Sequence, residues 1–220
     1  MPEPIEQTIA IINSPDSKLR DITPIIYRLN DSHPAHITRF RYLDQTCCAS
    51  GTMRNWLSTE YGSEGWHMQT DQKDDSPIFA LVRDPRERWW SGVRSWMNNL
   101  PWYSWWENEQ LMTDYFPHFN RFTTSQWQIL DQVEVDHYIK VDSDLADRFA
   151  NFCRKHKLLQ YGRLKKLKNH RHQDENVMKM ENTGRSQLEK FLRQNKKWND
   201  KLEEFLAPDY AYWDRVSGQA

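Results

Sequence analysis

The stretch that decides the fold runs from Pro77 to Gly92 and reads PIFALVRDPRERWWSG. Its first six residues form a continuous apolar run, which is typical of a strand buried on both faces of a parallel sheet. After Arg83, Asp84 is placed to cap a helix, Pro85 suits the first helical position and Glu87 completes a capping box. The stretch therefore predicts a buried strand that passes directly into a helix. The inward face of that helix is expected to carry Trp89, Trp90, Val93, Trp96 and Met97.

Upstream, the same order of elements is expected around a short segment of small and polar residues. Residues 37–43 resemble a strand, and residues 44–52 are small or polar. Met53, Trp56 and Leu57 follow with the spacing of an amphipathic helix. A strand, a loop of small residues and a helix in this order can surround a phosphate with backbone N–H groups.

Downstream, the pattern favours one more strand and several helices. Residues 125–133 predict a short helix, and His137–Val141 predict a strand whose following helix is capped at Asp142 or Ser143. A last helix is expected to stop at Pro208. Residues 98–122 are rich in aromatics and form either a lid over a site or part of the core. The inward residues of these helices are expected to be Leu145, Phe149, Phe152, Cys153, Leu188, Phe191, Leu192, Trp198, Leu202, Phe205 and Leu206.

Strands that alternate with helices predict an α/β fold with a mostly parallel sheet between two layers of helices. The chain of 220 residues is long enough for one such domain, expected over residues 37–214. Residues 1–36 predict an extended arm with one or two short strands, and residues 215–220 a tail. Ligands of such sheets bind beyond the carboxyl ends of the strands, which places residues 46–52 and 83–91 at the expected site.

Composition excludes several other classes of protein. No run of about 18 apolar residues is present, so a membrane span is not expected. The first residues carry two Glu and no basic cluster, so a signal peptide is not expected either, and the predicted location is the cytoplasm. Three cysteines cannot all pair, which favours a reducing compartment. His170 and His172 lack the spacing of a metal site, and no metal is expected.

A resemblance sharpens the functional prediction. The segment from Phe79 to Gly92 is similar to the 3′-phosphate-binding motif of sulfotransferases that use PAPS (3′-phosphoadenosine-5′-phosphosulfate), and most similar to the carbohydrate sulfotransferase branch. Weaker similarities extend the resemblance over residues 37–214. It implies a sulfotransferase fold of the P-loop nucleoside-triphosphate-hydrolase type. It also implies transfer of a sulfuryl group from PAPS to a hydroxyl or amine acceptor, of carbohydrate or small-molecule type, without a metal.

The resemblance implies a donor site made of two parts. Arg83 and Ser91 are expected to bind the 3′-phosphate, and the upstream loop the phosphosulfate. The expected loop residues are Thr46, Cys47, Cys48, Ala49, Ser50, Gly51, Thr52 and Met53. The family's loop Lys is missing here, because its position falls on Thr46 or Cys47. The cations considered as substitutes are Arg41, Arg54 and Lys140.

The general base is expected downstream of the loop. Glu60 and His67 are the preferred candidates, and Glu64 and His118 are further ones. The absent Lys keeps a second function open, a nucleotide-binding protein of the same fold with weak or no catalysis. A third possibility is a nucleic-acid-binding module, because residues 154–201 carry 15 Lys or Arg against 5 Asp or Glu.

Overall fold

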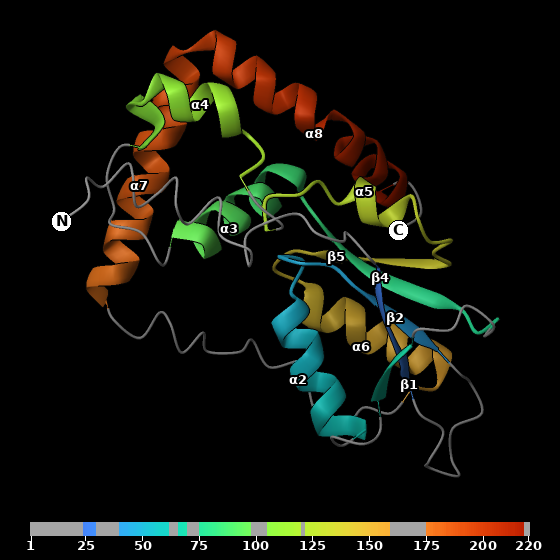
Figure 1. Ribbon diagram of the computed structural model, residues 1–220. Coiled ribbons are helices and arrows are strands. Elements are labelled where there is room, and N and C mark those ends of the chain that lie inside the picture. The colour runs from blue at the N-terminus through green and yellow to red at the C-terminus, as the bar shows by residue number, and fades with distance from the viewer. Residues whose placement is uncertain are drawn as a thin grey trace. The chain divides into compact units, whose positions relative to one another are not determined.

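The computed structural model shows an α/β protein whose chain divides into two compact units (Figure 1). We call the first the sheet unit; it is drawn from Thr23–Asp84, Gln126–Leu167 and Tyr212–Ala220. The second, the helical unit, includes Pro85–Ser125 and Lys168–Ala211. The structure describes residues 24–29, 40–61, 66–69, 75–97, 105–119, 122–158 and 175–217.

The sheet unit contains an open, mixed sheet with the strand order β3-β1-β2-β4-β5. The parallel half predicted from the sequence consists of β2, β4 and β5, and β1 pairs antiparallel with both β2 and β3. The α/β class is thus confirmed, and β1 realises the short strand expected in residues 1–36. The strands are β1 Ile25–Leu29, β2 Arg41–Asp44, β3 Trp66–Gln69, β4 Ile78–Arg83 and β5 His137–Val141.

The register of the parallel strands brings their carboxyl ends to one edge of the sheet. Leu43 of β2 lies opposite Ala80 of β4, and Arg83 of β4 lies opposite Val141 of β5. β4 is hydrogen-bonded to β2 on one side and to β5 on the other, and its apolar residues are all buried, as the continuous apolar run predicts. The last residues of the parallel strands therefore adjoin the segment that follows β2, as the sequence predicts.

The core of the sheet unit lies between the sheet and the helices α2 Ser50–Tyr61 and α6 Leu145–His156, which Figure 1 shows on one side of the strands. A short helix, α5 Trp127–Leu130, also belongs to this unit. Met53, Trp56 and Leu57 are buried as predicted, and the ring of Trp56 packs edge-on against Phe149 at 4.7 Å between centroids. The amphipathic spacing of both helices thus defines this core.

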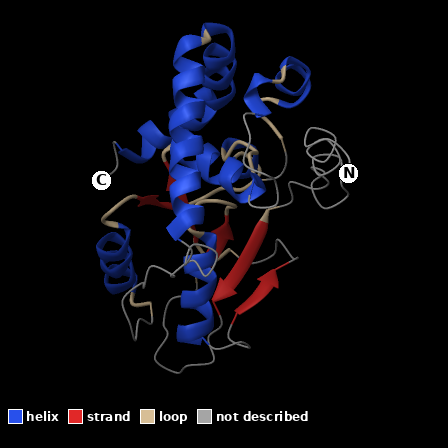
Figure 2. Ribbon diagram, turned by 90° about the vertical axis from the view of Figure 1, so that its left-hand side faces the viewer, coloured by secondary structure: helices blue, strands red, loops and turns tan. Residues whose placement is uncertain are grey.

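In its described part the helical unit contains helices and no strands (Figure 2). The described aromatic and aliphatic residues of its segment 105–119 are largely buried, which confirms the core interpretation for this part of residues 98–122. The indole N–H of Trp89 donates to the carbonyl of Pro117 at 2.8 Å. This hydrogen bond links the segment to the helix that carries Trp89, residues 85–97. The elements are α3 Pro85–Met97, η1 Trp105–Glu107, α4 Glu109–Tyr115, α7 Glu175–Gln194 and α8 Lys196–Ser217, of which residues 196–211 belong here.

The prediction that Pro208 ends the last helix is wrong. The helical run is interrupted at Asn195 instead, and α8 continues through Pro208 to Ser217, into the expected tail. Proline removes one backbone donor and one hydrogen bond from a helix interior. Burial of Leu206 before it and of Asp209 after it anchors the helix on both sides, and this packing outweighs the local signal.

None of the helices in the described ranges combines the length and the apolar character needed to cross a membrane.

Candidate functional site

The segment between β2 and α2 has an unusual backbone. Cys47 and Ala49 have positive φ angles of 66° and 58°. For residues other than glycine this left-handed conformation is sparsely populated and costs about 1–2 kcal/mol each. Such strain persists where the surrounding structure enforces it, and it is often found at ligand-binding sites. The segment Gln45–Ala49, which we call the β2–α2 loop, is therefore the first element of the candidate site.

The helix after this loop begins earlier than the sequence indicates. The amide of Met53 already donates to the carbonyl of Ala49 at 3.0 Å, and α2 starts at Ser50 rather than at Met53. The predicted loop residues 50–53 therefore form the first helical turn. The N–H groups of a first turn have no partner within their helix and attract anions. The backbone N–H groups expected to surround a phosphate thus belong to the first turn of α2 as well as to the β2–α2 loop.

The strand-end arginine lies beside this loop. Arg83 is the last residue of β4, and its Nη1 donates to the carbonyl oxygen of Cys47 at 3.5 Å. This contact confirms the predicted proximity of the two segments. A half-buried guanidinium next to a helix N-terminus gives the loop a positive field, which favours an anionic ligand.

Gln126 joins the loop to the strand end, and sequence reasoning missed it. Its Nε2 donates to the carbonyl of Arg83 at 2.8 Å, while its Oε1 accepts the Arg83 N–H at 3.2 Å and the Cys48 thiol at 3.5 Å. The side chain is buried and enters from the start of α5. No local pattern marks a single Gln before a short helix, so the sequence offers no signal for this role.

A second buried amide contributes an unused donor. Gln45 is 0% exposed, and its Oε1 lies 3.9 Å from the Cys48 thiol. Its Nε2 has no hydrogen-bond partner among the residues that the structure describes. A buried donor without a partner is costly, so this N–H is available to an acceptor on a ligand.

The three cations considered as substitutes for the missing Lys each contact a partner outside the loop. Arg41 lies at the opposite end of β2 and donates to the Ser76 carbonyl at 2.7 Å. Arg54 forms a 2.9 Å ion pair with the buried Asp44. Burial raises the pKa of Asp44, and the charge of Arg54 opposes this rise. Lys140 lies over the Trp213 ring, 5.0 Å from its centroid. Arg83 is thus the cation that the described structure places against the loop.

Ser91, the expected second ligand of the 3′-phosphate, lies on α3 in the helical unit, whereas Arg83 ends β4 in the sheet unit. Each is positioned by its own unit, and their joint role stays a prediction. Next to Ser91, a Cβ on Gly92 would lie 2.1 Å from the carbonyl oxygen of Phe122. This position requires glycine because the chain at Phe122 passes so close to α3.

Two of the proposed bases, Glu60 and His67, belong to the sheet unit and lie outside the loop. Glu60 is buried in the last turn of α2, about 15 Å along the helix axis from Ser50. The pKa of the Cys153 thiol is raised to about 12, mainly because the thiol is buried and secondly because of the charge of Glu60. The backbone of His67 lies in β3, at the outer edge of the sheet. His118 belongs to the helical unit, and Glu64 lies outside the described residues.

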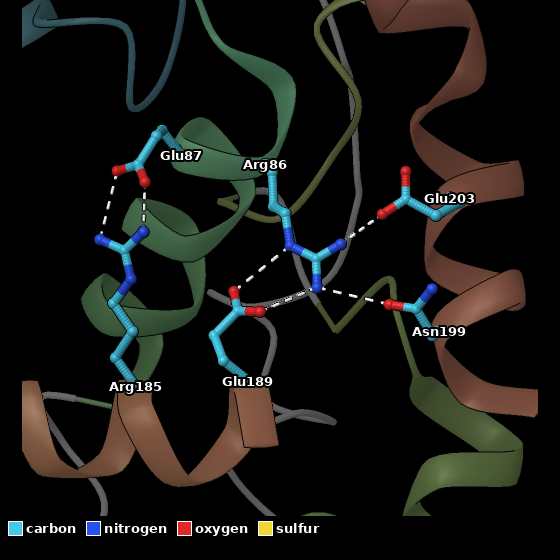
Figure 3. Close-up of polar contacts among 6 residues, drawn as sticks. All are labelled: Arg86, Glu87, Arg185, Glu189, Asn199 and Glu203. Atoms are coloured by element: carbon cyan, nitrogen blue, oxygen red, sulfur yellow. Dashed lines mark hydrogen bonds and ion pairs between the residues drawn. The ribbon is translucent and has the colours of Figure 1, made fainter. Parts of the chain in front are cut away.

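The helical unit holds a separate polar network, shown in Figure 3. The guanidinium of Arg86 grips the carboxylate of Glu189 with Nε at 3.3 Å and Nη2 at 2.9 Å. It also pairs with Glu203, and Nη2 lies 3.4 Å from the amide oxygen of Asn199. These contacts tie α3 to α7 and α8.

The basic segment is only partly visible. Residues 159–174, with His170 and His172, lie outside the described residues. Of the described cations, Arg185 pairs with Glu87, Lys196 pairs with Asp200, and Lys201 donates to the Thr113 carbonyl at 3.2 Å. Each of these three side chains has a partner within the chain, and the nucleic-acid possibility stays a prediction. None of the three cysteines forms a disulfide.

Comparisons with family models, with curated proteins and with solved structures found no match. The structure itself shows an α/β protein with an open sheet flanked by helices.

Proposed function

We propose that the chain is a sulfotransferase that uses PAPS as its donor, on a three-layer fold of the P-loop type. One observation carries the proposal: the guanidinium of Arg83, at the carboxyl end of β4, lies against the strained β2–α2 loop at the N-terminus of α2. This is where an α/β sheet binds phosphorylated ligands.

The residues around the loop fit an anionic donor. The first turn of α2, the unused Nε2 of Gln45 and the guanidinium of Arg83 supply donors for phosphate and sulfate oxygens. In the proposed assignment Arg83 holds the 3′-phosphate together with Ser91. Donors that face developing negative charge on the leaving phosphate stabilise the transition state.

The proposed reaction is an in-line displacement at sulfur. The bond between sulfur and the bridging oxygen of the donor breaks, a bond from sulfur to the acceptor oxygen or nitrogen forms, and the acceptor proton passes to a general base. The distance of Glu60 from the loop, about 15 Å along α2, disfavours it as that base for an acceptor held at the first turn. His67 stays a candidate.

Nucleotide binding tests the donor site. Isothermal titration should show that 3′-phosphoadenosine-5′-phosphate binds at least about tenfold more tightly than AMP, because only the former carries the 3′-phosphate. Arg83→Ala should weaken its binding about 10- to 100-fold, the usual range for a charge-assisted contact. Arg154→Ala, which removes an exposed charge from α6 of the same unit, is the matched control and should change it less than twofold. Equal binding of the two nucleotides would refute the proposal.

A second function on the same site, nucleotide binding without turnover, is favoured by one observation: the loop has no Lys, and Asp44 neutralises Arg54. Incubation with labelled PAPS and a panel of glycans, small alcohols and amines separates the two. Sulfated product that disappears in Arg83→Ala supports the transferase. Tight binding with no product on any acceptor supports the binder.

A further inference from the structure

Arg88 in the helical unit presents an anomaly that the proposed donor site does not use. It is 1% exposed, and its Nε and Nη2 have no hydrogen-bond partner within the described part of the chain. Burial of a guanidinium without a counter-charge is strongly unfavourable, so a folded protein normally supplies one.

The described carboxylates do not supply that counter-charge. No ion pair joins Arg88 to a carboxylate among the described residues, and the buried Asp209 of the same unit accepts the Ser125 hydroxyl at 2.6 Å. The charge of Arg88 acts on a histidine: after burial, it is the second cause that lowers the pKa of His118. The Nε2 of His118 lies 3.1 Å from the Thr124 hydroxyl. Within the described ranges, Arg88 thus has no compensating carboxylate.

The two unused nitrogens form one edge of the guanidinium. Nε and Nη2 point the same way and match two oxygens of a single planar or tetrahedral oxyanion. Arg86, two residues earlier on α3, shows the mode of binding, because it holds the carboxylate of Glu189 with the same two nitrogens (Figure 3). Arg88 has the same edge, and no described carboxylate pairs with it.

We propose that Arg88 is the centre of an oxyanion-binding site in the helical unit, where its Nε and Nη2 bind two oxygens of a sulfate or phosphate group. The group is either a free ion or part of a nucleotide, since the recognising chemistry is the same. The proposal does not depend on sulfuryl transfer.

Thermal unfolding of the full chain in sodium sulfate tests it, with sodium chloride at equal ionic strength as the reference. A ligand that binds the folded state raises Tm in a saturable way, whereas the general salting effect of sulfate acts on every variant alike. The wild type and the control Arg185→Gln, which loses a half-exposed ion pair to Glu87, should show the saturable rise. Arg88→Met should lose it. An equal response of wild type and Arg88→Met, or no saturable response, overturns the site.

A second titration with 3′-phosphoadenosine-5′-phosphate identifies the source of the group. If the nucleotide replaces the sulfate response and Arg88→Met loses both, the group is carried by the nucleotide; a response to sulfate alone assigns a free ion. Arg83→Ala keeps the two proposals apart, because it should abolish the preference for the 3′-phosphate and leave the sulfate response at Arg88 intact.

Two measurements on the wild type serve if Arg88→Met does not fold. Selenate soaked into crystals should give an anomalous peak beside Nε and Nη2. Bound sulfate should also raise the pKa of His118 in an NMR titration, because it offsets the charge of Arg88. Density that shows Arg88 paired with a protein group, and no anion, overturns the proposal.

Discussion

The side-chain amide of Gln126 pairs with the main chain of Arg83 on both sides of the residue: Nε2 donates to its carbonyl at 2.8 Å and Oε1 accepts its N–H at 3.2 Å. The side-chain amide thus forms the same pair of hydrogen bonds with Arg83 that a neighbouring strand would form at the end of β4. It holds in place the backbone from which the Arg83 side chain reaches the β2–α2 loop, and it also touches Cys48 in that loop. The position of Arg83 therefore depends on a residue 43 positions away in the sequence.

Gln126→Leu should destabilise the chain substantially. The change keeps the volume but leaves the main-chain groups of Arg83 without these side-chain partners, at about 1–3 kcal/mol for each buried group left unsatisfied. Urea denaturation gives the free energy of unfolding. The exposed Gln132→Leu on the same unit is the control, expected within about 0.5 kcal/mol of wild type. A loss no larger than that of the control would show that the pairing is unimportant.

Gly92→Ala should destabilise the helical unit. A methyl group at this position would lie 2.1 Å from the Phe122 carbonyl oxygen, so the backbone itself must move. Overpacking of this kind costs about 1–3 kcal/mol or more. A lower Tm by calorimetry is the expected result, and the exposed Ser186→Ala on α7 should leave Tm nearly unchanged. An unchanged Tm for Gly92→Ala would contradict the close approach.

Stability should fall as the pH drops through the ordinary histidine range. Burial is the main cause that lowers the pKa of His118, His137 and His156 below the ordinary value of 6.5. The unfolded chain therefore binds more protons than the folded chain below about pH 6.5, and folding loses stability there as the pH falls. Urea unfolding at pH 7.5 and 5.5 measures the loss.

His118→Gln should make that loss smaller. Glutamine retains a polar group that can reach Thr124, the partner of His118 Nε2, and removes one titrating group while His137 and His156 still titrate. A loss between the two pH values as large as in the wild type would show that His118 contributes nothing to the acid sensitivity.

Pro208→Ala should stabilise the protein, because Pro208 lies exposed inside α8. Alanine restores the backbone donor and relieves the steric conflict with the preceding turn, up to about 3 kcal/mol. The neighbouring exposed Ala207→Gly should lose about 0.5–1 kcal/mol if the helix is continuous there. A lower Tm for Pro208→Ala would mean that the proline is needed for a bend that the packing uses.

Local sequence patterns determined much of the architecture. The apolar run ending at Arg83 and the Asp84–Pro85 step predicted β4 and the start of α3, and the spacing of Met53, Trp56 and Leu57 predicted the buried face of α2. These features follow from strand burial, helix capping and helical period, which neighbouring residues specify among themselves.

Only the tertiary structure decided the contacts that make a site. Packing decides that Gln126 reaches Arg83 and that Asp44 neutralises Arg54. It also decides that Arg88 is buried with its Nε and Nη2 unpartnered among the described residues. Packing also extended α8 through Pro208, against the local signal. A sequence pattern records the period of an element and the residues at its ends, but it carries no record of the partners that the fold later places beside them.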